Sequence, residues 1–101
     1  MIKVISQFVK TDPELKWAYQ LQTEDYKNHI KTNYIDLGKL IEHTIEISPD
    51  NLRCTHTFLW SDIESFVRFQ EDPIVNDYHE NRHIYDQSNN ITRTLRDISQ
   101  I

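Results

Sequence analysis

Glycine is nearly absent from this chain of 101 residues, in which Gly38 is the only one. A loop that holds phosphate groups needs several glycines, because only a backbone without side chains can approach the phosphates closely. The sequence therefore excludes a P-loop and the glycine-rich fingerprint of dinucleotide-binding proteins.

Cysteine and long apolar stretches are also scarce. Cys54 is the only cysteine, so the chain can form neither an internal disulfide nor a zinc site with several cysteine ligands. No segment has the apolar length that is needed to cross a membrane, and the amino-terminal residues alternate too much in polarity for a signal peptide. We therefore expect a cytoplasmic protein that has no membrane partner.

The charged residues argue against nucleic acid as a partner. The chain has 16 acidic residues and 11 lysines and arginines, for a net charge of -5, and the basic residues do not cluster. Phosphate backbones are bound by clustered lysine and arginine. The length of 101 residues predicts a single domain, residues 1–101, with a core so modest that dimerisation would support it.

The first half of the chain alternates between strand and helix signals. Residues 2–9 are apolar on both faces and predict a central strand. Asp12 as a helix cap and Pro13 in the first turn predict a helix that continues to about residue 31. Residues 35–47 are rich in strand formers, and the turn sequence SPDN leads into a further strand, 52–60, as in a hairpin.

The second half begins with a helix, in which Ser61 and Glu64 have the spacing of a capping box. The predicted buried face of this helix comprises Ile63, Phe66, Val67 and Phe69. Asp72 precedes a proline, which disfavours helical geometry and predicts a break before a second helical piece at about 73–86. Residues 91–101 predict a last strand. The order β-α-β-β-α-β predicts a ferredoxin-like α+β sandwich, with four antiparallel strands and the helices on one face.

Residues 79–83, HENRH, match the H-E-x-x-H pattern of zinc peptidases. On a helix, His79 and His83 lie on one face, where both can bind a metal ion, and Glu80 can polarise a bound water. Such a site also needs a third protein ligand and a substrate groove. Two other interpretations stay open, namely an exposed helix face with incidental histidines and a contact between His79 and a ligand.

The hairpin contains a second pair of histidines. With a four-residue turn, His43 faces His56 across the two strands, on a mostly apolar face that would lie beneath the helices. The opposite face is polar and carries Glu42, Thr44, Glu46, Arg53, Thr55 and Thr57. A buried imidazole needs hydrogen-bond partners. The pair is therefore either structural, bonded to a neighbour such as Tyr78 or Tyr85, or catalytic, moving a proton to or from a ligand.

Other candidates have a structural explanation beside a functional one. Cys54 is predicted to be buried in mid-strand as a small hydrophobe rather than a nucleophile. Arg93 and Arg96 on the last strand are either solvated or in contact with an anionic ligand. Aromatic residues at helical spacing form either the core or the wall of a ligand cleft, and these are Trp17, Phe66, Phe69, Tyr78 and Tyr85.

One segment resembles a known family. The run WSDIESFVRFQEDP, residues 60–73, resembles the strand-to-helix segment of antibiotic-biosynthesis-monooxygenase-like dimeric α/β-barrel proteins. In both, a tryptophan ends the strand, a polar cap and a glutamate follow, and a proline bends the helix. The resemblance implies a homodimer whose two sheets close into a barrel, a small ligand between sheet and helices, and cofactor-independent oxygenase chemistry.

A haem-degrading branch of the same family gives a second implication. Its iron-ligating histidine corresponds to His79, whereas its tryptophan before the bend is replaced by Phe69 and its asparagine on the first strand by Ser6 or Gln7. We therefore expect no cofactor, with haem as the alternative.

These patterns lead to one hypothesis about function. We expect a homodimer that binds a small, largely apolar molecule in the cleft between sheet and helices, with His43 and His56 as proton-transfer residues. The predicted ligand contacts are Trp60, Phe69, Tyr78 and His79. The alternative is a non-catalytic dimeric module for ligand binding or assembly, and a zinc hydrolase that uses the HENRH residues is the third interpretation.

Overall fold

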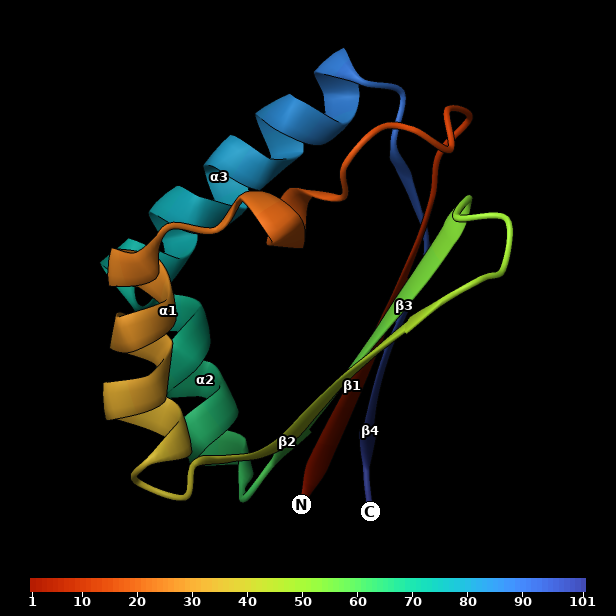
Figure 1. Ribbon diagram of the computed structural model, residues 1–101. Helices are drawn as coiled ribbons and strands as arrows, with labels where there is room; N and C mark the ends of the chain where they lie inside the picture. Colours follow the sequence, from red (N-terminus) through yellow and green to blue (C-terminus); the bar gives the residue numbers. More distant parts are fainter.

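Four antiparallel strands form one sheet in the computed structural model, which describes residues 1–101 (Figure 1). The strands are β1 (Ile2–Val9), β2 (Leu40–Ile47), β3 (Arg53–Trp60) and β4 (Thr92–Gln100), and their spatial order is β2-β3-β1-β4. The helices cover one face of the sheet and leave its other face open. This arrangement is the predicted ferredoxin-like α+β fold.

The helical layer consists of the two connections between strands. The segments η1 (Ala18–Leu21), α1 (Glu24–Ile30) and η2 (Lys31–Ile35) connect β1 to β2, and α2 (Ile63–Glu71) and α3 (Pro73–Ser88) connect β3 to β4. None of these helices combines the length and the apolar character that spanning a membrane takes.

The predicted start of the first helix is wrong. Oδ1 of Asp12 does accept the N–H of Glu14 (2.9 Å), as a helix cap would, but residues 13–17 form a turn and irregular backbone, so no helix follows it. Aspartate side chains make the same local hydrogen bond in turns and at helix caps. The α-helix begins only at Glu24, where Thr23 caps it by accepting the N–H of Tyr26 (3.1 Å).

The predicted start of the second strand is also wrong. Residues 31–35 continue the first helix as a wider π-helical turn, in which the N–H of Asp36 donates to the carbonyl of Lys31 (2.8 Å). Gly38 then reverses the chain with a φ of +70°, a conformation that glycine adopts without strain. The strand β2 begins at Leu40.

The predicted helix break at Asp72 is confirmed. Its backbone is extended (ψ 118°), so α2 ends there, and its carboxylate caps α3 by accepting the N–H of Ile74 (2.9 Å). The predicted cap of α2 is off by one residue, because Asp62 and not Ser61 accepts the N–H of Ser65 (2.8 Å).

The buried face of α2 is narrower than predicted. Ser65, Phe66 and Phe69 are buried, whereas Ile63 and Val67 are 53% and 39% exposed. At 100° per residue, Ile63 and Val67 lie on the flank beyond Phe66, and this flank points away from the core. Both side chains therefore remain largely outside the core of the single chain.

The core is divided into two clusters. The larger contains Ile2, Val4, Tyr34, Leu40, Trp60, Phe66, Phe69 and Val75, and the smaller contains Phe8, Trp17, Cys54 and Ile91. In all, 16 of the 101 residues are buried, and large apolar side chains such as Leu95 and Ile98 on β4 stay exposed. The chain on its own thus buries a small core for its length.

Candidate functional site

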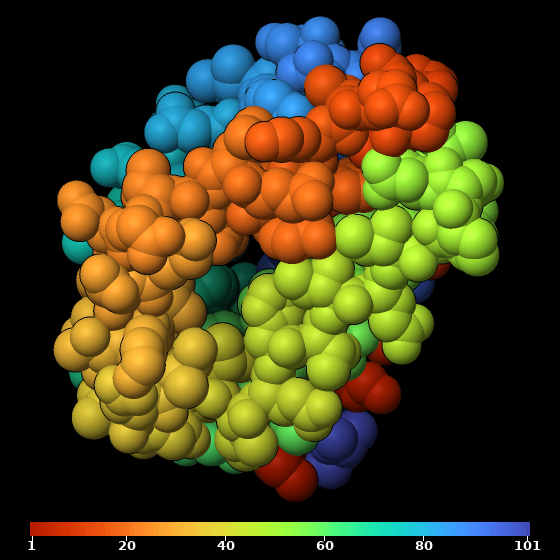
Figure 2. Space-filling view, in the orientation of Figure 1, coloured from red at the N-terminus to blue at the C-terminus, as the bar shows by residue number.

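A cavity of about 440 Å³ lies between the sheet and the helices. Figure 2 shows the molecule hollowed between the orange-to-yellow segment of α1 and η2 and the yellow-green strand β2. The cavity is lined by 27 residues from all four strands and all five helical segments, and 15 of the 27 are hydrophobic. A cavity of this size and composition suits a small, largely apolar ligand.

The predicted site residues meet in this cavity. All six of them line it, and these are His43, His56, Trp60, Phe69, Tyr78 and His79. They come from β2, β3, α2 and α3, so segments far apart in the sequence contribute to one site. The roles assigned to these residues stay predictions.

His43 and His56 touch, although not in the predicted register. The turn takes up more residues than expected, so Ile47 pairs with Cys54 and His43 lies opposite Phe58. The register differs from the prediction by two residues, which keeps every side chain on its predicted face. The two histidines are therefore diagonal neighbours, and Nε2 of His43 lies 3.0 Å from Nδ1 of His56.

A row of aromatic rings holds this pair in place. The ring of His43 stacks on that of Phe58, with centroids 4.1 Å apart and planes at 11°. Phe58 is followed along the strand by Trp60, at 6.5 Å and 13°. Tyr19 from η1 meets the ring of His56 edge-on at 5.4 Å. Both imidazoles are thus fixed before any ligand arrives.

The surroundings keep these imidazoles uncharged at neutral pH. Burial, followed by repulsion from His43 when that ring is protonated and from Arg82, lowers the pKa of His56 to about 4. Burial also lowers the pKa of His43. A neutral imidazole has one N–H donor and one acceptor nitrogen, so one proton can be shared between the two rings. Nδ1 of His43 has no hydrogen-bond partner within the chain.

Cys54 lies behind His56, with its Sγ 3.5 Å from Nε2 of the ring. The thiol is completely buried, and burial raises its pKa to about 11. It therefore stays protonated at neutral pH and behaves as the small hydrophobe that the sequence predicts, not as a nucleophile. Its polar contact with His56 occupies the second ring nitrogen of that histidine.

The predicted tyrosine partners of the histidine pair are wrong. The hydroxyl of Tyr78 accepts a hydrogen bond from Nε2 of Gln22 (3.1 Å), and the hydroxyl of Tyr85 donates to the carbonyl of Lys16 (2.5 Å). Both tyrosines tie α3 to the segment before α1. The longer hairpin turn placed the histidines against each other and against Cys54 instead.

Trp60, Phe69 and Tyr78 belong to the walls of the cavity. The rings of Trp60 and Phe69 pack at 4.7 Å between centroids, and Trp60 is only 1% exposed. The ring of Tyr78 packs against Tyr26 at 4.2 Å. Trp60 and Phe69 are therefore core and cavity wall at the same time, whereas Tyr78 is a half-buried part of the wall.

His79 approaches the cavity from α3. Its ring lies edge-on to Phe69, with centroids 5.9 Å apart. Burial and the charges of Arg82, Arg96 and Arg93 lower the pKa of His79 to about 4, so its imidazole is neutral. A histidine ligates haem iron through a neutral imidazole, and His79, which lines the mostly apolar cavity, fits haem in this respect. Haem binding stays a prediction.

The zinc interpretation of HENRH has no third ligand. Glu80 and His83 are exposed and do not line the cavity, whereas His79 does. No three side chains of the His, Cys, Asp or Glu type are grouped so that they could hold a metal ion. A structural or catalytic zinc ion needs at least three protein ligands.

Sequence reasoning missed Arg82, which lines the cavity from α3. Its guanidinium pairs with the carboxylate of Asp86 (3.1 Å) and lies 5.2 Å above the ring of Phe8. Arg82 follows Tyr78 by four residues and His79 by three, so all three share one helix face. That spacing was the signal that could have found it.

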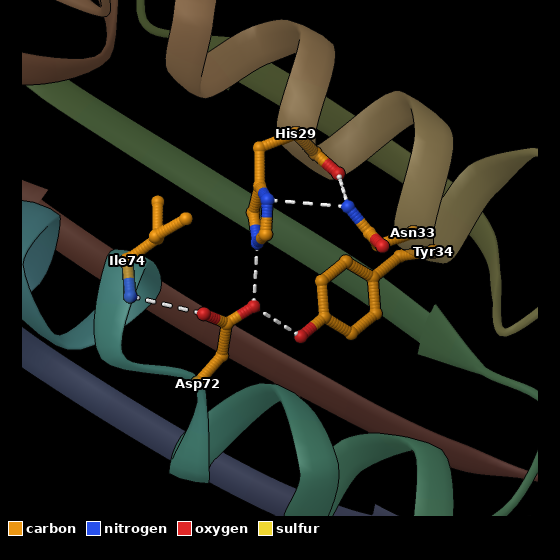
Figure 3. A network of polar contacts seen from close by, with 5 residues as sticks. All are labelled: His29, Asn33, Tyr34, Asp72 and Ile74. Atoms are coloured by element: carbon orange, nitrogen blue, oxygen red, sulfur yellow. Dashed lines mark hydrogen bonds and ion pairs between the residues drawn. The ribbon is translucent and has the colours of Figure 1, made fainter.

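A network of polar contacts ties the helices together beside the cavity (Figure 3). Oδ2 of Asp72 accepts a hydrogen bond from the hydroxyl of Tyr34 (2.6 Å) and lies 2.6 Å from Nε2 of His29. Burial opposes ionisation of Asp72, but the hydrogen bonds from Tyr34, His29 and the N–H of Ile74 outweigh it and hold its pKa below the usual value. None of Asp72, His29 and Tyr34 lines the cavity, so the network supports the helices.

No protein-family model and no curated protein matches the sequence. Solved structures do match the fold. A cofactor-independent oxygenase from Streptomyces nogalater superposes with a TM-score of 0.64 at 11% identity, over 99% of this chain and 91% of that one. A candidate antibiotic biosynthesis monooxygenase from Deinococcus radiodurans gives 0.58 at 7% identity, over 100% and 92%.

A dimeric ferredoxin-like protein from an uncultured marine organism gives a TM-score of 0.59 at 16% identity, over 97% of this chain and 84% of that one. At these identities the likeness shows the fold. This chain therefore has the ferredoxin-like fold of antibiotic-biosynthesis-monooxygenase-like proteins, as the segment 60–73 predicted.

Proposed function

We propose that this protein binds a small, largely apolar molecule in the cavity and that its histidine pair moves a proton of the bound molecule. The observation that carries the proposal is the contact of His43 with His56 (3.0 Å) in the wall of a mostly apolar cavity. Apolar walls alone support binding. A neutral imidazole at the wall adds a group that can take up a proton.

His43 is the proposed base. Its Nδ1 has no partner within the chain, so this atom is free for a ligand. When Nδ1 takes up a proton, the N–H at Nε2 donates to Nδ1 of His56. The low pKa of His56 keeps that ring neutral and able to accept. His56 is thus a positioning residue, which stabilises the charge on His43 through a charge-assisted hydrogen bond.

The proposed reaction is an oxygenation without a cofactor. A solved structure with the same fold is that of a cofactor-independent oxygenase, which supports this direction. Removal of a proton from an acidic CH2 group leaves an electron-rich anion that reacts with O2. Overall, the CH2 group and O2 become a carbonyl group and water. If the protein does not catalyse this reaction, the same cavity supports the alternative function, a non-catalytic module for ligand binding.

Binding is tested with 1-aminoanthracene, a neutral apolar fluorophore. We expect saturable binding by fluorescence titration, weakened at least about tenfold in Ser6→Leu, because the larger side chain fills part of the cavity. Gln7→Leu is the matched control, since Gln7 is the next residue on β1 and does not line the cavity. Equal binding by Ser6→Leu and the wild type would place the ligand elsewhere.

Proton transfer is tested with anthrone, an apolar ketone that has an acidic CH2 group. We expect the wild type to consume O2 in an oxygen electrode and to form anthraquinone, with a rate at least about tenfold lower in His43→Gln. His83→Gln removes an exposed histidine of α3 and should keep the wild-type rate. Binding of 1-aminoanthracene without O2 uptake would leave the binding module as the function.

A further inference from the structure

The cavity has the opposite charge balance to the molecule around it. In the whole chain, acidic residues outnumber lysines and arginines by 16 to 11. Among the residues that line the cavity, the only acidic one is Asp86, whereas the basic ones are Lys27, Arg82, Arg93 and Arg96. The lining of the cavity thus carries a net positive charge, although the protein as a whole is acidic.

Two of these cations have no acidic partner. Lys27 and Arg82 each pair with a carboxylate of their own helix, at 3.0 and 3.1 Å. Arg93 and Arg96 take part in none of the ion pairs of the chain. Both are exposed on the edge strand β4, so they keep part of their hydration while their side chains reach the cavity.

The strand pairing brings the arginines to the same end of the cavity. On β4, Arg93 lies opposite Phe8 and Arg96 opposite Ser6, and both of these β1 residues line the cavity. Arg82 reaches the ring of Phe8 from α3 (5.2 Å). The sheet edge and α3 therefore present guanidinium groups around the same short stretch of β1.

These charges act on one another. Burial, followed by the charges of Arg93 and Arg82, lowers the pKa of Arg96. The same arginines contribute to the low pKa of His79. Like charges that are held together without a counter-ion are unfavourable, and a bound anion relieves the repulsion. A bound anion is therefore electrostatically favoured at this site.

We propose that the ligand of this cavity is an amphipathic organic acid, whose carboxylate is held by Arg93 and Arg96 while its apolar part packs on the aromatic walls. A guanidinium fork matches the two oxygens of a carboxylate through parallel hydrogen bonds. Arg82 adds positive charge from the helical side. The inference rests on the proposed function and names the chemical class of its ligand.

The test uses a matched pair of probes, 1-pyrenebutyric acid and its methyl ester, which share one apolar body and differ in the carboxylate. We expect the wild type to bind the acid at least about tenfold more tightly than the ester at low salt, and added salt to reduce this preference. The variant Arg93→Gln/Arg96→Gln should bind both probes with the affinity of the ester. Arg53→Gln, a strand arginine that does not line the cavity, is the matched control.

The outcomes separate this inference from the proposed function. Equal binding of acid and ester by the wild type, or an unchanged preference in the double variant, overturns the anion site and leaves the apolar cavity intact. If neither probe binds, and 1-aminoanthracene does not bind either, the proposed function fails together with the inference. If the double variant does not fold, the salt dependence in the wild type decides, and a preference that salt leaves unchanged contradicts the proposal.

Discussion

At the scale of single residues, the cavity histidines make the stability of the protein depend on pH. An unfolded histidine titrates near pH 6.5, whereas folded His56 and His79 titrate at about 4. Between these values the unfolded chain binds protons that the folded protein does not bind. The free energy of unfolding therefore falls as the pH drops from about 6.5 to about 4.

We expect His56 and His79 each to contribute about 1 to 2 kcal/mol to this loss, after allowance for their partial exposure. Urea unfolding between about pH 7 and about pH 4 measures it. His56→Gln should flatten the dependence on pH, and His83→Gln, at an exposed position, should leave it as in the wild type. A wild-type slope in His56→Gln would show that the ring of His56 is not desolvated.

The sequence predicted cavity residues correctly where a polar side chain stands among apolar residues on one face of a strand. His43 and His56 stand in alternating strands, and a register error of two residues still leaves both on the cavity face. Arg82 and Tyr19 escaped detection for different reasons. Arg82 lies in the HENRH stretch, whose polar residues indicate an exposed helix face, and Tyr19 lies in η1, which is too short to show a periodicity.

At the scale of elements, Asp72 is the junction of the helical layer. It ends α2, caps α3 and accepts the hydroxyl of Tyr34 from η2, beside His29 of α1 (Figure 3). One residue thus joins four helical segments, α2 through its backbone and α3, η2 and α1 through its side chain. The packing of Tyr34 against Trp60 and Phe69, two residues of the cavity wall, depends on this contact.

We expect Asp72→Ala to lower the free energy of unfolding by about 2 to 4 kcal/mol, because it removes a helix cap and leaves a buried hydroxyl without its acceptor. Asp62→Ala is the matched comparison. It removes the cap of α2 alone, which costs about 1 kcal/mol. Chemical denaturation of both variants measures the difference. Equal losses would mean that the contacts of Asp72 with Tyr34 and His29 contribute nothing.

The boundaries of helices were predicted correctly where a residue favours a single backbone conformation. Helical geometry is disfavoured for a residue before a proline, and the predicted break at Asp72 was found. Asp12 accepts the N–H of Glu14 in a turn that no helix follows, and the hydroxyl of Ser61 contacts that of Ser65 while Asp62 caps the helix. In a sequence, side chains that bond backbone groups in turns look the same as those that cap helices.

At the scale of the whole molecule, the open face of the sheet is the surface on which we expect two copies of the chain to form the predicted homodimer. The helices leave this face uncovered (Figure 1), and a protein with the same fold is described as dimeric. Leu95 pairs with Gln7, away from the cavity, and is 45% exposed in the single chain. Covering such side chains would add apolar burial to a small core.

We expect the protein to sediment as a dimer and Leu95→Glu to sediment as a monomer, because an unpaired charge is costly in an apolar interface. Ile84→Glu introduces the same charge at an exposed position of α3, on the helical side, and should stay dimeric. Analytical ultracentrifugation measures all three proteins. A wild type that sediments as a monomer contradicts the expected dimer.

The fold was predictable because strand order and helix placement follow from a few strong signals, the hairpin, the two connections and the apolar central strand. The single-domain prediction for residues 1–101 stays a prediction. The sequence predicted a cleft between sheet and helices but not its size. Its volume depends on how far the helices stand from the sheet, and that distance is set by packing among Trp60, Phe69 and Tyr34.

The two tryptophans have a practical consequence. Trp17 and Trp60 are 3% and 1% exposed, they belong to different core clusters, and both line the cavity. The unlabelled protein therefore carries two optical reporters of occupancy. A molecule that enters the cavity changes the surroundings of an indole ring and hence its emission, whereas unfolding moves both indoles into water and shifts the emission to longer wavelength. Occupancy and unfolding can thus be followed in one cuvette.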